Sequence, residues 1–340
     1  MKKFVVAIVL LLLFPLLPAE KMNVPLEKNV PTIVDEFFTP ENITLKDDAF
    51  HVFPLHVETW YYEAFFNNNY SMVFITTVLS NGKIGLTLTG FYIYRNGHLE
   101  YKDRVITPSP FFFVSTEKPL IKIFGKEIIN GDIDVEGNLF YIISFKKNGY
   151  GISLTFINET KGWKGNMSRG WWLAVPQCKV MGNLIIKDEI IRVEGEGYHD
   201  HNIFPLFTPL VERGYIDGKL IQGSFSIVWG KIFHTRWHND TFAVISKKGK
   251  YISIPQKDIT IKEYSYIYDH GRFIPTKVNF SFNTSNEMEG FLHMKAEDFH
   301  HIRLPFLWYW RYHVIVKGRV KIGKDEMEIN KREMMELMIY

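Results

Sequence analysis

Cysteine is almost absent from this chain of 340 residues, which contains a single one, Cys178. One thiol cannot form an intramolecular disulfide, so stability must come from an ordinary apolar core. An excess of one charge sign is lacking too, because the formal net charge is +3 and Lys and Arg are spread along the chain. This balance gives no indication of a nucleic-acid partner.

Several enzyme motifs are also missing. The sequence has no G-x-S-x-G elbow, no Walker loop, no dinucleotide G-x-G-x-x-G opening a helix and no H-E-x-x-H. Cys178 follows Pro176 and Gln177, a position more typical of a passive core thiol than of a nucleophile. We therefore predict no cofactor.

Helical periodicity is lacking as well, since no stretch before the C-terminus repeats apolar residues every 3.6 positions over three turns. The best helical candidate, Lys324 to Met338, begins equally well as a strand followed by a short tail. The chain is instead 16% aromatic and rich in short runs of Val, Ile and Thr. Turn dipeptides separate these runs: Asn81-Gly82, Asn96-Gly97, Gly137-Asn138, Asn148-Gly149, Asp217-Gly218 and Lys248-Gly249. This spacing predicts an all-β sandwich or barrel, and two barrels fit the length better than one.

The N-terminus has the layout of a secretory signal. An uncharged apolar stretch of 14 residues, Phe4 to Leu17, follows two lysines. A membrane-spanning helix needs roughly 20 apolar residues, so an uncleaved anchor is the alternative, and membrane association would come only through this segment. We predict a signal peptide at 1–19, an extended leader at 20–45, an N-terminal barrel at 46–205 and a C-terminal barrel at 206–340. The proline-bracketed segment Ile203 to Gly214 is the expected connection between the barrels.

N-glycosylation sequons are in excess and agree with a secreted or cell-surface location. Chance would give roughly two N-x-[ST] triplets, whereas the chain carries seven, at Asn42, Asn69, Asn158, Asn166, Asn239, Asn279 and Asn283.

Polar groups occur among aromatics in several strands. In "HVETWYYEAFF" an extended strand places His56, Glu58, Trp60 and Tyr62 on one face, which suits a pocket wall or a simple edge strand. Further along, Trp171 and Trp172 must point to opposite sides of their strand, one into a core and one toward a cleft. The run His300 to Gly318 could complete an apolar cavity or be plain barrel core.

The stretch "GEGYHDHNIF", Gly195 to Phe204, is the most polar of these strands. Simple alternation turns His199 and His201 inward and Asp200 outward. A β-bulge at Gly195 or Gly197 would reverse this and turn Tyr198, Asp200 and Asn202 toward a cavity. The sequence leaves the facing of Asp200 open, and an acid role for Asp200 within the barrel requires that Asp200 rather than the two histidines faces inward.

A metal site is the alternative interpretation of the same strand. His199 and His201 place two imidazoles on one side, but zinc needs a further donor. His234 and His238, or His300 and His301, are candidates, yet spacing fixes none of them. We therefore predict no metal.

Three of these stretches resemble, in order, the carotenoid 1,2-hydratase (hydroxyneurosporene synthase) and AttH-like lipocalin superfamily, which also includes pericyclases of the Diels–Alderase type. An "H..EWWY"-like strand corresponds to His56 through Tyr61, and a "V.G.L" strand after an aromatic-Pro stretch corresponds to Val180 through Leu184. A "G.GY.DHNWG"-like ending is matched by Gly195, Gly197, Tyr198, Asp200, His201 and Asn202. The resemblance covers roughly residues 50 to 205. The chain departs from it at Thr59, where the family has Trp, and after Asn202, where the family has Trp-Gly.

The resemblance implies two tandem antiparallel lipocalin-like barrels with a hydrophobic cavity. It also implies that Asp200 is the acid that protonates a polyene double bond, with Tyr198 beside it. A carboxyl in an apolar pocket stays protonated more easily, which suits a general acid. The residues expected to line the site are Trp171, Trp172, His199, His201, Asn202, Glu58, Trp60 and Tyr62.

Together these observations predict an exported lipocalin-like protein that binds a hydrophobic, isoprenoid- or polyene-like small molecule. It would act as a hydratase or cyclase through Asp200, or it would only carry the molecule. The alternative is a non-enzymatic, secreted, glycosylated binding or interaction protein, and a metal-dependent hydrolase is the third possibility.

Overall fold

A computed structural model describes residues 39–41, 43–53, 55–81, 85–167, 170–235, 238–248, 250–284, 288–304 and 307–340. Almost all of these residues lie in antiparallel strands, so the predicted all-β fold is confirmed. The predicted signal peptide, most of the predicted leader and Asn42 lie outside the described residues. The described part of the chain contains no helix of the length and apolarity that a membrane crossing requires.

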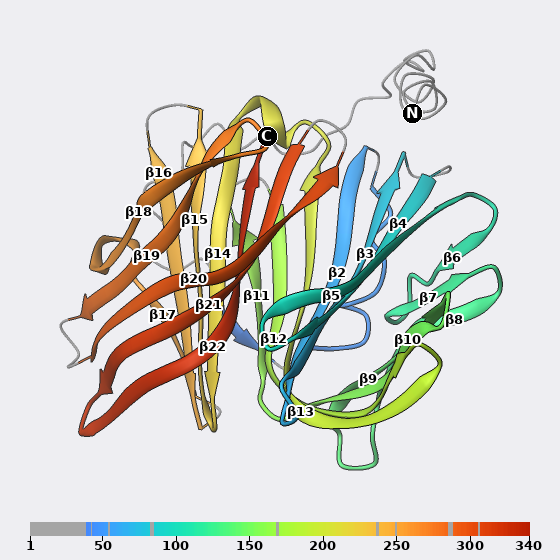
Figure 1. Ribbon diagram of the computed structural model, residues 1–340, viewed down its shortest axis with the longest axis horizontal. Coiled ribbons are helices and arrows are strands. Elements are labelled where there is room, and N and C mark those ends of the chain that lie inside the picture. Colours follow the sequence, from blue (N-terminus) through green and yellow to red (C-terminus); the bar gives the residue numbers. More distant parts are fainter. Residues whose placement is uncertain are drawn as a thin grey trace. The chain divides into compact units, whose positions relative to one another are not determined.

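The strands of residues 39–205 form the first sheet, on the right in Figure 1. Within the described residues it comprises β1 Thr39–Glu41, β2 His56–Phe66, β3 Tyr70–Ser80, β4 Gly85–Arg95, β5 His98–Pro108, β6 Phe112–Val114, β7 Leu120–Ile123, β8 Lys126–Ile133, β9 Leu139–Lys147, β10 Tyr150–Asn158, β11 Gly162–Met167, β12 Gly170–Ile186 and β13 Glu189–Pro205.

The strands of residues 212–339 form the second sheet, on the left in Figure 1. They are β14 Glu212–Gln222, β15 Phe225–His234, β16 Asn239–Lys247, β17 Lys250–Ile254, β18 Ile259–Asp269, β19 Arg272–Thr284, β20 Met288–Leu304, β21 Leu307–Ile322 and β22 Asp325–Ile339. Two short 3-10 helices, Thr208–Leu210 and Gln256–Asp258, lie between strands. The chain passes from one sheet to the other through residues 206–211.

Both sheets follow the same path. In each, the first long strand pairs with the last, β2 with β13 and β14 with β22, and the other strands continue outward on either side as meanders. The two edge strands of each sheet are consecutive in the chain: β5 and β6 in the first sheet, β17 and β18 in the second. A meander that curls until its edges approach is the barrel arrangement, so the two halves share the strand order of antiparallel barrels in tandem.

Local turn signals predict several of the hairpins. Asn96-Gly97 and Asn148-Gly149 both have positive φ at both positions, as a two-residue hairpin turn requires, and they join β4 to β5 and β9 to β10. Asp217-Gly218 is not a turn, because it lies inside β14. Gly218 is needed there for close packing, since a Cβ would come within 2.6 Å of the Trp229 ring. The ambiguous C-terminal stretch is a strand, β22.

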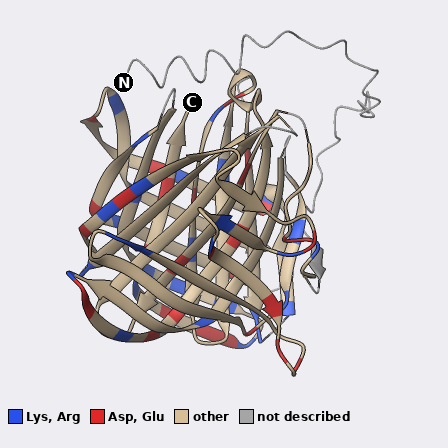
Figure 2. Ribbon diagram, turned by 90° about the vertical axis from the view of Figure 1, so that its right-hand side faces the viewer, with Lys and Arg blue, Asp and Glu red and all other residues tan. Residues whose placement is uncertain are grey.

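Apolar side chains form three cores. One fills the interior of the first barrel around Trp60 and Phe156, and one fills the second around Trp229 and Trp310. The third lies between the sheets, where Tyr61 and its neighbours meet residues of β15, β16 and β21. Charges of both signs are interspersed along the strands (Figure 2). Because the first and third cores lie on opposite sides of them, the central strands of the first sheet are buried on both faces. Any polar group on these strands must find a partner.

Candidate functional site

Strands β2 and β13 pair in continuous register, from Gly195 opposite Phe66 to Pro205 opposite His56. One face of this pair meets the interior of the first barrel, where His201 stacks on Trp60. The other face meets the second sheet. Two polar networks therefore lie back to back on the same strands.

The interior network is centred on His201, which lies between two buried carboxylates. Its Nε2 donates a hydrogen bond to Glu58 Oε1 at 2.7 Å, and its Nδ1 is 3.0 Å from Asp48 Oδ1. The Asp48 contact is an ion pair rather than a well-aligned hydrogen bond. Asp48 also accepts a hydrogen bond of 2.9 Å from His199 Nε2. Asp48 comes from the segment 43–53, which precedes β2 and reaches into the barrel.

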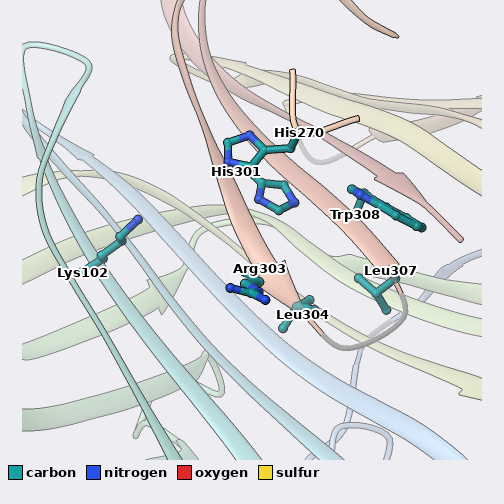
Figure 3. Close-up of a pocket in the computed structure, with 7 residues that line it drawn as sticks. All are labelled: Lys102, His270, His301, Arg303, Leu304, Leu307 and Trp308. Carbon is teal, nitrogen blue, oxygen red and sulfur yellow. The ribbon is translucent and has the colours of Figure 1, made fainter. Parts of the chain in front are cut away.

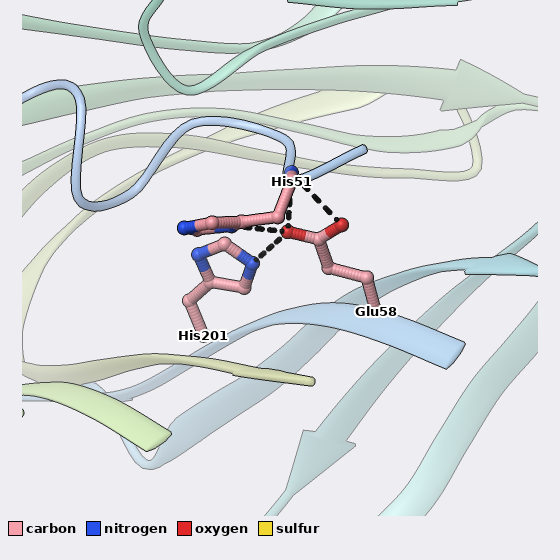
Figure 4. Close-up of side chains that lie close together, drawn as sticks. All are labelled: His51, Glu58 and His201. Carbon is pink, nitrogen blue, oxygen red and sulfur yellow. Dashed lines mark hydrogen bonds and ion pairs between the residues drawn. The ribbon is translucent and has the colours of Figure 1, made fainter. Parts of the chain in front are cut away.

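Glu58 joins two further histidines to this network (Figure 4). Its Oε1 accepts a hydrogen bond of 2.9 Å from His51 Nδ1, and both carboxylate oxygens lie within reach of the His51 backbone N–H. Its Oε2 accepts a hydrogen bond of 3.2 Å from His56 Nε2. The Glu58 side chain is fully buried, whereas that of His51 is 29% exposed. His51 is therefore the member of the network that faces solvent.

These contacts determine the charge of the network. Burial opposes ionisation of Glu58, but hydrogen bonds from His201, His51 and His56 outweigh it and lower its pKa to about 2. The pKa of Asp48 is lowered in the same way by His199 and His201. Burial also opposes protonation of His201, yet its two carboxylate partners raise its pKa to about 9. At neutral pH His201 is thus an imidazolium held between two carboxylates.

The second network lies between the sheets and begins at Lys219 of β14. Its Nζ is 2.8 Å from Glu63 Oε2 on β2 and sits over the rings of Tyr61 and Tyr198, at 4.6 and 4.5 Å from their centroids. Tyr61 donates a hydrogen bond of 2.7 Å to the same Glu63 oxygen. A lysine of the second sheet is thereby bound by groups of the first.

Arg311 of β21 continues this network. Its Nε donates to Glu336 Oε1 at 2.8 Å and its guanidinium also donates to the hydroxyls of Tyr309 and Tyr94. The Arg311 side chain is fully buried, and it lies 4.7 Å from the Tyr92 ring centroid. Because Tyr92 and Tyr94 belong to β4, Arg311 links the two sheets.

Three acids near the inter-sheet network are held toward their neutral form, whereas Arg311 and Lys219 outweigh burial and lower the pKa of Glu336. Burial raises the pKa of Asp200 to about 7 against the opposing charge of Lys219, and it raises the pKa of Asp217 well above its usual range. Burial raises the pKa of Glu333 to about 7 in the same way. Such perturbed groups are typical of functional sites, although they also occur in structural ion networks.

An open cleft of about 520 Å³ lies where β5 of the first sheet faces the end of β20 and the start of β21 (Figure 3). It is lined by Lys102, His270, His301, Arg303, Leu304, Leu307 and Trp308. A smaller cavity of about 70 Å³ shares three of these residues and reaches Tyr92 and Arg104. None of the described residues lining either cavity is acidic. The cleft therefore combines cationic and apolar lining residues, and the smaller cavity reaches Tyr92, which contacts Arg311 of the inter-sheet network.

The predicted site residues divide between the two faces. Those inside the first barrel are Glu58, Trp60, Tyr62, Trp171, His199 and His201. Those on the inter-sheet face are Trp172, Tyr198, Asp200 and Asn202, whose amide donates to Asp200 at 3.1 Å. Trp171 and Trp172 do point to opposite sides, as predicted. Asp200 does not share a cavity with Glu58 and Trp60, and its catalytic role and that of Tyr198 stay predictions.

The bulge expected in β13 at Gly195 or Gly197 is wrong. The irregularity lies instead in the partner strand β12, between Val175 and Cys178. The two glycines are needed for close approach of the backbones, because a Cβ on Gly195 would lie 1.9 Å from Phe65 O and one on Gly197 2.8 Å from Glu63 O. Without a bulge in β13, simple alternation holds and the histidines face inward.

Four residues of the two polar networks were not predicted from the sequence: Asp48, His51, Lys219 and Arg311. The signal for His51 was available, because His51, His56 and Glu58 place three donors within eight residues. Arg311 interrupts an aromatic run, which indicates a buried charge. Nothing local distinguishes Asp48 or Lys219 from surface charges.

The protein has two antiparallel barrels in tandem, and the motif residues of β2 and β13 lie at the centre of the first. This arrangement defines a two-barrel lipocalin-like protein. No family model matches the sequence, and no curated protein matches it. Solved structures do match. A protein from Nitrosomonas europaea assigned as AttH superposes with a TM-score of 0.66 and 12% identity, over 96% of this chain and 98% of that chain.

Two further solved structures share the fold. Kievitone hydratase from Nectria haematococca has a TM-score of 0.54 and 10% identity, over 89% of this chain and 97% of that chain. CghA with Sch210972 has a TM-score of 0.53 and 9% identity, over 90% and 98%. The chain thus has the AttH-like, lipocalin-like fold that the sequence motifs predict.

Proposed function

We propose that this protein is exported and binds an apolar, isoprenoid- or polyene-like small molecule that carries one anionic group. The proposal rests on the cleft between the two sheets. Leu304, Leu307 and Trp308 offer apolar contact, while Lys102 and Arg303 supply positive charge without an acidic neighbour in the lining. An elongated molecule can place its apolar body on the first group and its carboxylate or phosphate on the second.

Surface exposure of the sequons supports export. Asn69, Asn166, Asn239 and Asn283 are exposed, and Asn158 and Asn279 are half-buried. Glycans need exposed acceptor sites, so four of the predicted positions can carry them without change to the barrels.

Binding is tested with cis-parinaric acid, a fluorescent polyene carboxylate, and with its uncharged methyl ester. We expect the protein to bind both and to prefer the acid. Replacing both cations of the cleft, Lys102→Gln with Arg303→Gln, should weaken binding of the acid about tenfold and that of the ester less than twofold, since exposed ion pairs contribute modestly.

The matched control is Lys126→Gln, which removes an exposed lysine of β8 and should leave both affinities unchanged. Native mass spectrometry of the exported protein, with extraction of bound lipid, is the complementary measurement. Absence of binding by either probe, together with no co-purifying apolar molecule, would contradict the proposal.

A second candidate function, hydration or cyclisation of the bound molecule, is favoured by the position of Asp200 on the inter-sheet face with Tyr198 and Asn202, together with its raised pKa. In hydration the Asp200 carboxyl would give its proton to one alkene carbon, water would bond to the carbocation at the other, and the water proton would return to the carboxylate. A fold neighbour, kievitone hydratase, bears the name of such an enzyme.

Oxygen-18 exchange tests this role. Wild-type protein incubated in labelled water with its co-purified ligand should incorporate the label, and Asp200→Asn should lose incorporation while still binding the ligand. Equal incorporation by the two proteins would exclude Asp200 as the acid.

A further inference from the structure

We propose that His51, Glu58 and His201 form a binding site for one divalent cation of the zinc type, a role independent of the proposed function. Figure 4 shows the three side chains converging from β2, β13 and the segment before β2. Each offers one donor atom, and the three atoms lie within 4.8 Å of one another.

The donor set suits zinc. Two imidazole nitrogens and one carboxylate oxygen are a common combination, and three protein donors leave a fourth position for water or a ligand. Tetrahedral zinc at about 2.0–2.1 Å from each donor sets the donors about 3.3 Å apart. Glu58 Oε1 is now 2.9 Å from His51 Nδ1 and 2.7 Å from His201 Nε2, so a small rotation of the carboxylate makes room.

Asp48 and His56 orient these donors. Asp48 holds the other ring nitrogen of His201 at 3.0 Å, which points Nε2 toward Glu58. His56 holds the second oxygen of Glu58, and its own Nδ1 donates to Phe53 O at 2.6 Å. Carboxylates behind ligating histidines are the usual support of zinc sites.

The charge of this cluster and its exposure at one residue also favour a bound cation. Asp48 and Glu58 place two carboxylates in a fully buried region, and a divalent ion bound at Nε2 of His201 would replace the proton of that ring and keep both carboxylates neutralised. His51, whose side chain is 29% exposed, lies beside Trp171 at 5.3 Å between ring centroids. The cluster therefore reaches solvent at His51.

Among the described residues a second group has metal-binding spacing: His234, His238 and Asp240. Its His238 is exposed, and Gln256 rather than a carboxylate contacts Asp240 from behind. This group is more exposed than the first, and it provides a matched comparison.

The experiment uses the full exported protein, treated with EDTA and dialysed, with zinc chloride as the probe. Isothermal titration and elemental analysis should find one zinc per chain, and zinc should raise the melting temperature by several degrees. Cobalt(II) in place of zinc should show the intense visible absorption of a tetrahedral site.

His51→Ala should weaken zinc binding by about 100-fold and abolish the cobalt spectrum, whereas His238→Ala should change neither. Glu58→Gln should behave as His51→Ala does. If Glu58→Gln fails to fold, His51→Ala decides, because His51 lies outside the strands and is partly exposed. No zinc uptake by the wild-type protein, or uptake lost in His238→Ala and kept in His51→Ala, overturns the proposal.

Discussion

Arg311→Met is expected to lower the free energy of unfolding by about 3–5 kcal/mol, the usual cost of removing one partner of a buried ion pair. Arg311 neutralises Glu336 at 2.8 Å, and the two side chains are 0% and 9% exposed. Without the guanidinium, Glu336 keeps only Lys219 as an opposing charge while Asp217 stays close. Glu336 must then take up a proton or remain buried and poorly paired.

The loss should also loosen the contact between the sheets. The hydroxyl of Tyr94 on β4 and the ring of Tyr92 contact Arg311 from the first sheet. A methionine can fill the space but cannot donate to these groups or to Tyr309. We therefore expect a lower unfolding midpoint in urea, measured by tryptophan fluorescence.

Two variants make the comparison specific. Arg311→Lys keeps the charge and loses the planar fork, so its destabilisation should be intermediate. Arg319→Met removes an exposed arginine that pairs with Glu326, and it should change stability by less than about 0.5 kcal/mol. Equal midpoints for Arg311→Met and the wild-type protein would show that the buried pair contributes nothing.

The features that the sequence predicts are local. Asn96-Gly97 specifies its hairpin through its own backbone, and the alternation of His56, Glu58 and Trp60 needs only an extended strand. The all-β fold and the opposite facing of Trp171 and Trp172 follow from the same period of two.

The features that escape the sequence depend on partners far along the chain. A glycine in a strand indicates either a bulge or the close approach of another backbone. Gly195 is a case of close approach, because the carbonyl of Phe65 on β2 leaves no room for a Cβ. Asp48 acquires its role only when the segment before β2 folds into the barrel that contains β13. Its partner His199 lies 151 positions further along the chain. The division of the candidate site between two faces was decided by such contacts.

Asp200→Asn is expected to remove one of several contributions to the pH dependence of stability between about pH 4 and 7, beside those of Asp217 and Glu333. Burial raises the pKa of Asp200 from 3.8 to about 7. Between these values the folded protein binds a proton that the unfolded chain has released, so stability from this group is complete below about pH 4 and is lost as the pH rises to 7.

The expected difference is large because the raised pKa spans several pH units. Each unit corresponds to about 1.4 kcal/mol, so the wild-type protein should lose about 3 kcal/mol relative to Asp200→Asn between pH 4 and 7. Asparagine has the same shape and no charge to desolvate, so it can keep the contact with Asn202 at no such cost. Urea unfolding at intervals from pH 4 to 8 measures how the stability of the two proteins depends on pH.

The matched control is Asp188→Asn, which replaces an exposed aspartate paired with Lys146. Its stability should change with pH in parallel with that of the wild-type protein. If Asp200→Asn also ran parallel, Asp200 would be ionised throughout this range and could not be held as the neutral acid that protonation of a double bond requires.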